Sequence, residues 1–179
     1  MGLITIIVFV RIVGLTEYGK YSVKLSFLTA YSALVIGWLN QSILRYYSKY
    51  QNNPQLPNIF TIGLTSSLIL GVLLMFVINR LTLNSGLFLL NITSLFLFLA
   101  LCSFQFLSTV LRAQLKPNSV IQITVIQSIL RFIFPLLLLW YLTPNHKYLL
   151  IGLALSYIII PIFFFMKKKD RFNKLWSNF

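Results

Sequence analysis

Five long apolar runs dominate the sequence, and they constrain its fold more than any other feature. The runs cover residues 22–44, 59–79, 87–109, 119–142 and 148–166. A helix needs about 20 predominantly apolar residues to cross the hydrocarbon core of a bilayer. Within that core a helix satisfies its backbone hydrogen bonds inside a single segment, which an isolated strand does not. The runs therefore predict an all-α, polytopic transmembrane helical bundle.

A sixth, shorter apolar run at residues 2–13 precedes the other five. It is too short to span a bilayer, so it is either re-entrant or the remaining part of a shortened first helix, and we favour the second interpretation. Gly14 and Gly19 bracket Glu17 and Tyr18, which predicts a turn at Glu17 and Tyr18 and a helical hairpin that reverses at the membrane surface. We expect about six spans within residues 1–166, followed by a basic cytoplasmic tail at 167–179.

The distribution of positive charge predicts the orientation of the bundle. The formal net charge is +13, but the cationic residues lie between apolar runs and form no nucleic-acid-binding motif, so we expect no nucleic-acid partner. The connections and tail after the second, fourth and sixth runs hold nine of these residues: Arg45, Lys49, Arg112, Lys116, Lys167, Lys168, Lys169, Arg171 and Lys174. The opposite side holds three, Lys20, Arg80 and Lys147, or four if Lys24 is counted. The positive-inside rule therefore places the tail in the cytoplasm and the first turn outside.

Acidic residues and metal ligands are too few for the common kinds of catalysis. The only two acidic residues are Glu17 and Asp170, and neither lies inside an apolar run. This excludes a pair of intramembrane carboxylates for acid–base chemistry. His146 and Cys102 are the only residues of their types, so no metal-binding cluster is expected. We predict that the chain is not an enzyme and has no catalytic residue, metal or cofactor.

One face of the run at 22–44 carries small and polar residues at helical spacing. Its members are Ser22, Ser26, Ala30, Ala33, Gly37 and Asn40. Such a face indicates either close helix packing or the lining of a wetted cavity, and from the pattern alone we favour packing.

Two segments resemble a known family of membrane proteins. RIVGLTEYGKYS (11–22) and GWLNQSILRYYSKY (37–50) are similar to the first helical hairpin of Wzx-like flippases, polysaccharide and lipid-linked oligosaccharide exporters of the MATE/MOP superfamily. The resemblance implies one lobe, the N-terminal half, of a two-lobed transporter of the cell inner or plasma membrane. It implies a function in polysaccharide biosynthesis and export, with an undecaprenyl-diphosphate-linked oligosaccharide as substrate. Membrane lipids and a missing C-terminal lobe would be the other partners, and we expect the chain to be a fragment or half of a split transporter.

Two other functions are compatible with this composition. A MATE-type drug/cation antiporter fragment would need a membrane-embedded carboxylate for its coupling ion, and no apolar run contains one. A non-transporting membrane scaffold would not need polar residues inside its spans. Both alternatives are therefore less favoured than the flippase.

The candidate binding residues are polar or cationic residues within or next to the runs. Arg131 lies near the middle of 119–142, where a charge is costly unless it faces a cavity or a partner. It either bonds to helix carbonyls and polar neighbours or binds the phosphates of a lipid-linked sugar, and we favour phosphate because guanidinium binds it in a bidentate fork. The remaining substrate-binding candidates are Gln127, Asn40, Gln105 and Arg45. We interpret Arg11 and Lys24 as interfacial cations whose charged groups extend to the membrane surface.

Overall fold

The described part of the chain folds into six α-helices. The computed structural model describes residues 2–51, 53, 55–81, 92–141 and 145–167, and these contain no strand. The helices are α1 (Gly2–Val13), α2 (Leu15–Tyr50), α3 (Leu56–Leu81), α4 (Ile92–Ala113), α5 (Pro117–Tyr141) and α6 (His146–Lys167). All except α1 contain a segment long and apolar enough to cross a membrane. The prediction of an all-α, polytopic membrane bundle is confirmed.

The helices and the apolar runs differ mainly at their ends. The 36 residues of α2 correspond to about 54 Å of helix, whereas the hydrocarbon core of a bilayer is about 30 Å thick. Helix α2 therefore extends past both ends of the run at 22–44. The first five residues of the run at 87–109, and the predicted tail beyond residue 167, lie outside the described residues.

The turn between the first two helices lies earlier than the sequence predicts. Gly14 separates α1 from α2 and has a φ of +88°, a left-handed backbone conformation that glycine adopts without steric penalty. Glu17, Tyr18 and Gly19 instead belong to the first turns of α2. The prediction of a turn at Glu17 and Tyr18 is wrong, because a single glycine is sufficient for the reversal and a helix tolerates Gly19 at a cost of about 1 kcal/mol.

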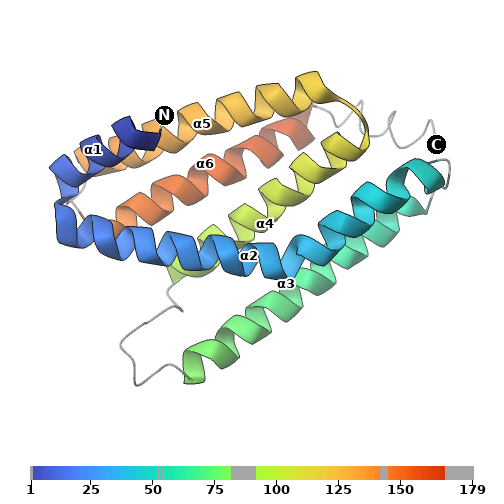
Figure 1. The fold of residues 1–179 in the computed structure, drawn as a ribbon, viewed down its shortest axis with the longest axis horizontal. Coiled ribbons are helices and arrows are strands. Elements are labelled where there is room, and N and C mark those ends of the chain that lie inside the picture. The colour runs from blue at the N-terminus through green and yellow to red at the C-terminus, as the bar shows by residue number, and fades with distance from the viewer. Residues whose placement is uncertain (1, 52, 54, 82–91, 142–144, 168–179) are drawn as a thin grey trace.

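Helices α4 and α6 lie at the centre of the bundle. Helix α4 packs against both α2 and α6, and α6 packs against α5 as well. Figure 1 shows α3 at one edge, beside α2, and the short α1 folded back beside α5 at the opposite edge. This arrangement places α1, α2 and α5 around one end of the bundle.

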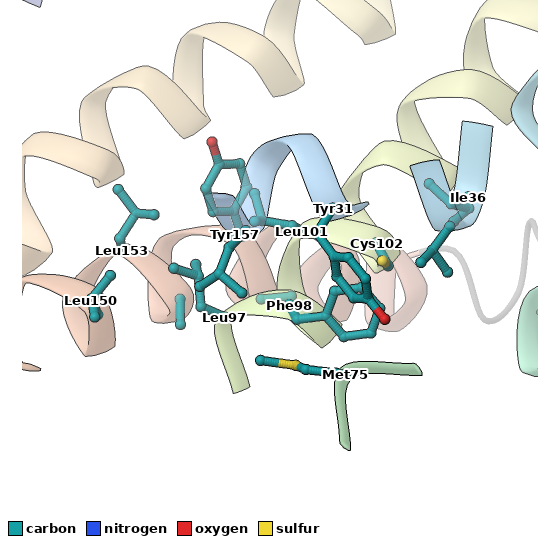
Figure 2. Close-up of a cluster of buried hydrophobic side chains, with 14 of the residues drawn as sticks. Tyr31, Ile36, Met75, Leu97, Phe98, Leu101, Cys102, Leu150, Leu153 and Tyr157 are labelled. Carbon is teal, nitrogen blue, oxygen red and sulfur yellow. The ribbon is translucent and has the colours of Figure 1, made fainter. Parts of the chain in front are cut away.

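The core is made of large side chains from α2, α3, α4 and α6. Figure 2 shows Phe98 of α4 between Tyr31 of α2 and Met75 of α3, with Leu150 and Leu153 of α6 on the other side of the cluster. All five side chains are buried. The Tyr31 hydroxyl donates a hydrogen bond of 2.5 Å to the carbonyl oxygen of Gly71, which joins α2 to α3. Apolar packing and this buried hydrogen bond hold these four helices in a fixed arrangement.

Helices α5 and α6 approach each other closely at Pro135 and Gly152. A Cβ atom added to Gly152 would lie 2.6 Å from the Pro135 Cα atom and 2.7 Å from its nitrogen. Only a residue without a side chain allows two backbones to come this close. Pro135 lies inside α5 and is buried, so this contact fixes the middle of α5 against α6, one turn from Arg131.

Candidate functional site

A pocket of about 330 Å³ lies between α1, α2 and α5. Arg131, the main binding candidate from the sequence, is one of the residues that line it. The lining residues are Thr5, Ile6, Phe9, Tyr18, Tyr21, Ser22, Leu25, Ser26, Ser128, Arg131 and Phe132. Arg131 is the only charged residue among them, and every other polar side chain in the lining is a hydroxyl.

Helical spacing explains how the pocket walls form. Tyr18, Tyr21, Ser22 and Leu25 are three or four residues apart, so they share one face of α2. On α5 the same rule brings Ser128, Arg131 and Phe132 to one face. The rings of Phe9 in α1 and Phe132 in α5 stack with their centroids 6.1 Å apart. This stack holds α1 against α5, where α1 forms the third wall.

Arg131 shares the pocket with hydroxyl groups and with no carboxylate. Tyr21 of α2 is one of the hydroxyl-bearing residues that line the pocket with it. The arginine side chain is exposed, whereas Tyr21 is 4% exposed. The positive charge therefore remains without an anionic partner among the described lining residues, and the site is suited to bind an anion.

The backbone at Arg131 is also unusual. Pro135 has no N–H group, so the carbonyl of Arg131 receives no hydrogen bond from the residue one turn later. The Ser128 hydroxyl donates to the Thr124 carbonyl at 2.9 Å, so in the pocket Ser128 presents an oxygen atom rather than a free proton. Ser128 is therefore not a donor to an anion, whereas the Arg131 guanidinium offers several N–H groups.

The other predicted binding residues do not line this pocket. Gln105 donates a hydrogen bond of 3.1 Å to the Ser32 hydroxyl and thereby joins α4 to α2. Gln127 is 7% exposed, and its Nε2 atom makes no hydrogen bond within the described part of the chain. Asn40 is half-buried, and Arg45 is exposed with its guanidinium 5.6 Å from the centre of the Tyr46 ring. None of these four residues lines the pocket that holds Arg131, and their roles in binding stay predictions.

The small-residue face of α2 is open rather than packed. Ser26, Ala30 and Ala33 are exposed, and a Cβ atom added to Gly37 would meet nothing within 4 Å. Packing against another described helix, which the pattern favoured, is therefore not observed. The first part of this face, at Ser22 and Ser26, instead lines the pocket.

The predicted interfacial cations, Arg11 and Lys24, lie on α1 and α2, two of the helices that form the pocket. Arg11 is exposed in the last turn of α1, and Lys24 is half-buried in α2. Neither residue lines the pocket. Their interpretation as interfacial cations stays a prediction.

A second polar cluster joins the beginnings of α2 and α6. The Glu17 carboxylate accepts a hydrogen bond of 2.6 Å from Lys20 Nζ, and its other oxygen lies 2.6 Å from Nδ1 of His146. The backbone N–H of His146, the first residue of α6, donates to that oxygen at 3.3 Å. The hydrogen bonds from Lys20 and then His146 lower the pKa of Glu17 to about 2. Glu17 precedes the predicted span at 22–44, so this cluster is a surface contact that caps α6.

Neither cluster has the composition of a metal or redox site. Within the described ranges, no group of three or more His, Cys, Asp or Glu side chains is placed to hold a metal ion. Cys102 is a buried free cysteine in the core. The chemistry available in the pocket is the binding of an anion.

Tyr21 is one of several lining residues that the sequence did not identify as candidates. In the sequence Tyr21 lies three residues after Tyr18 and four before Leu25, and this spacing places all three on one helical face. That pattern identifies a face but not what the face meets across the pocket, which includes α5, roughly 100 residues later in the chain.

Comparison with known proteins gives one match. A family model described as "Polysaccharide biosynthesis protein" matches residues 1–178, which is nearly the whole chain. No curated protein and no solved structure matches the chain.

Proposed function

The chain belongs to the polysaccharide biosynthesis protein family, that of the Wzx-like flippases in the MOP superfamily, and we propose that it helps to move an undecaprenyl-diphosphate-linked oligosaccharide across the cytoplasmic membrane. In this proposal the pocket between α1, α2 and α5 binds the diphosphate group. The tail beyond α6 lies in the cytoplasm, and the connection between α1 and α2 lies outside.

The observation that carries the proposal is the composition of the pocket around Arg131. A single guanidinium with hydroxyl neighbours and no lining carboxylate offers donors and positive charge to phosphate oxygens. The volume of about 330 Å³ is near the lower end of the range for small-molecule sites. Such a pocket accommodates a diphosphate, and the larger oligosaccharide would extend through its open side.

The open face of α2 provides the direction in which the sugar would extend. Ala30 and Ala33 are exposed along the same helix that supplies Tyr21 and Ser22 to the pocket. Small side chains leave room beside the helix, and a second helical bundle facing them would enclose a path across the membrane. We propose such a bundle as the protein partner, together with membrane lipids.

An antiporter and a scaffold account for fewer of these features. Among the described residues the only carboxylate is Glu17, and it is engaged with Lys20 and His146 at the start of α2. It is therefore not placed within a span to bind a coupling ion. A scaffold would require neither Arg131 in the middle of α5 nor a pocket around it.

The proposal is tested by measuring the binding of inorganic pyrophosphate to the purified chain in detergent by isothermal titration calorimetry. We expect Arg131→Gln to weaken binding by roughly 10-fold or more, because a charge-assisted hydrogen bond contributes about 1.5–3 kcal/mol. Arg131→Lys should retain part of the affinity, since it keeps the charge but loses the bidentate fork.

Arg80→Gln is the matched control. Arg80 is an exposed arginine in the last turn of α3, and its guanidinium lies over the Phe76 ring, away from the pocket lining. This control removes the same charge and should bind pyrophosphate like the wild type. Equal affinities of Arg131→Gln and the wild type would refute the phosphate site.

A further inference from the structure

Tyr21 combines burial with a place in the pocket lining. The residue is 4% exposed, yet it lines the pocket together with Arg131. Tyr21 belongs to α2 and Arg131 to α5, so the two polar groups come from two different walls of the site. A tyrosine that is buried for packing alone would not need a hydroxyl at this position.

The chemistry of the two groups fixes the direction of a hydrogen bond between them. A guanidinium has N–H donors and no acceptor, so the Tyr21 oxygen would accept from Arg131. The phenolic O–H would then remain free to donate in another direction. An anion in the pocket would receive hydrogen bonds both from Arg131 and from the tyrosine that holds it.

The surroundings of Tyr21 make it a rigid support. Its ring contacts that of Tyr18, with centroids 5.6 Å apart and planes inclined by 44°. Tyrosine has only two side-chain torsions, whereas an arginine side chain carries about 2 kcal/mol of rotamer entropy when free. A fixed phenol oxygen reduces the entropy that Arg131 would lose when it binds a ligand, and this pre-organisation raises affinity.

We propose that Tyr21 is a binding and positioning residue of this pocket: it orients the Arg131 guanidinium and donates its own proton to the same phosphate-class anion. The inference rests on the proposed function, because it assigns a second residue to the same site. It predicts that the tyrosine ring alone, without its oxygen, is not sufficient for full affinity.

The first test is the pyrophosphate affinity of Tyr21→Phe, measured by calorimetry with the purified chain in detergent. We expect a loss of roughly 10-fold, corresponding to the loss of about one hydrogen bond. Tyr31→Phe is the matched control, because it removes a buried hydroxyl that bonds to Gly71, outside the pocket lining. The control should lower thermal stability and leave the affinity unchanged. An affinity of Tyr21→Phe equal to that of the wild type, or an equal loss in both variants, would overturn the proposal.

The second test measures the contact itself, without a ligand. The melting temperature is determined for the wild type, Tyr21→Phe, Arg131→Gln and the double variant. If the two side chains interact, the shift caused by Tyr21→Phe will be smaller when Arg131→Gln is already present than in the wild type. Equal shifts in both backgrounds would overturn the positioning role.

The two proposals fail in different ways. If Arg131→Gln binds pyrophosphate as well as the wild type does, the phosphate site is refuted, and the ligand-binding role of Tyr21 is refuted with it. If Arg131→Gln loses affinity while Tyr21→Phe keeps it, only the role of Tyr21 is refuted.

Discussion

Charge is balanced differently at the two polar clusters of this chain. Glu17 has two partners on the same protein, Lys20 and His146, and each lies 2.6 Å from one of its oxygens. The polar side chains that line the pocket with Arg131 all carry hydroxyl groups, and none is a carboxylate. The surface cluster is therefore complete without a ligand, whereas an anion from outside the chain would complete the pocket. This difference is why we assign binding to Arg131 and a capping role to Glu17.

The Glu17 cluster predicts how stability changes in acid. Because the folded state lowers the pKa of Glu17 from 4.5 to about 2, the carboxylate stabilises the fold fully above about pH 4.5, and this stabilisation is lost as the pH falls towards 2. Glu17→Gln removes that titration. We expect the melting temperature in detergent to fall more steeply for the wild type than for Glu17→Gln between about pH 5 and about pH 2. The difference should be small, since the pair is partly exposed to solvent, and parallel curves would contradict the role of Glu17.

Hydropathy predicted most of the helices but not their ends. The apolar runs identify the positions of α2 to α6 because the spans need apolar side chains whatever the details of packing. Helix α2 nevertheless continues to Tyr50, since Arg45 and Lys49 are compatible with a helix outside the membrane. The turn was predicted at Glu17 and Tyr18, a few residues after its actual position at Gly14. Gly14 and Gly19 are both glycines beside an apolar run, so the sequence alone does not show which of them forms the turn. Only the packing of α1 beside α2 and α5 distinguishes them.

The close contact of α5 and α6 predicts that one methyl group added at Gly152 will strongly lower the stability of the fold. Gly152→Ala would place a Cβ atom 2.6 Å from the Pro135 Cα atom, and backbone atoms have no rotamer with which to avoid it. The helices must separate, and overpacking of this kind costs about 1–3 kcal/mol. We expect a clear decrease of the melting temperature and a weaker affinity for pyrophosphate, because the separation moves α5 near Arg131.

The control for this experiment is Gly37→Ala. Gly37 also lies within a helix, but nothing lies within 4 Å of its added Cβ atom. Alanine favours the helical state over glycine by about 1 kcal/mol, so this variant should be as stable as the wild type or slightly more stable. Equal melting temperatures for the two variants would show that α5 and α6 are not held as closely as the structure indicates.

At the scale of the whole molecule, the pocket depends on helices that are far apart in sequence. Arg131 could be predicted from sequence because a charge in the middle of an apolar run is rare. Tyr21 could not, since its importance arises only when the fold brings α2 and α5 to the same pocket. Gln105 was selected by the same reasoning as Arg131, but its hydrogen bond to Ser32 shows that a polar residue in a span can serve packing between helices. Long-range packing is the information that a single sequence does not contain.

The arrangement of the helix ends leads to a prediction about the membrane. Contact between Glu17 and His146 places the beginnings of α2 and α6 together, so the α1–α2 and α5–α6 connections lie on one side. Lys49 is at the far end of α2, and the excess of positive charge on its side predicts that this side is cytoplasmic. Single cysteines replacing Gly19, Lys147, Lys49 and Asn118 in a Cys102→Ser background test this in intact cells with a membrane-impermeant maleimide. Positions 19 and 147 should react directly, and positions 49 and 118 should react only after the membrane is permeabilised. The reverse pattern would invert the orientation and place the Tyr21–Arg131 pocket nearer the cytoplasmic leaflet.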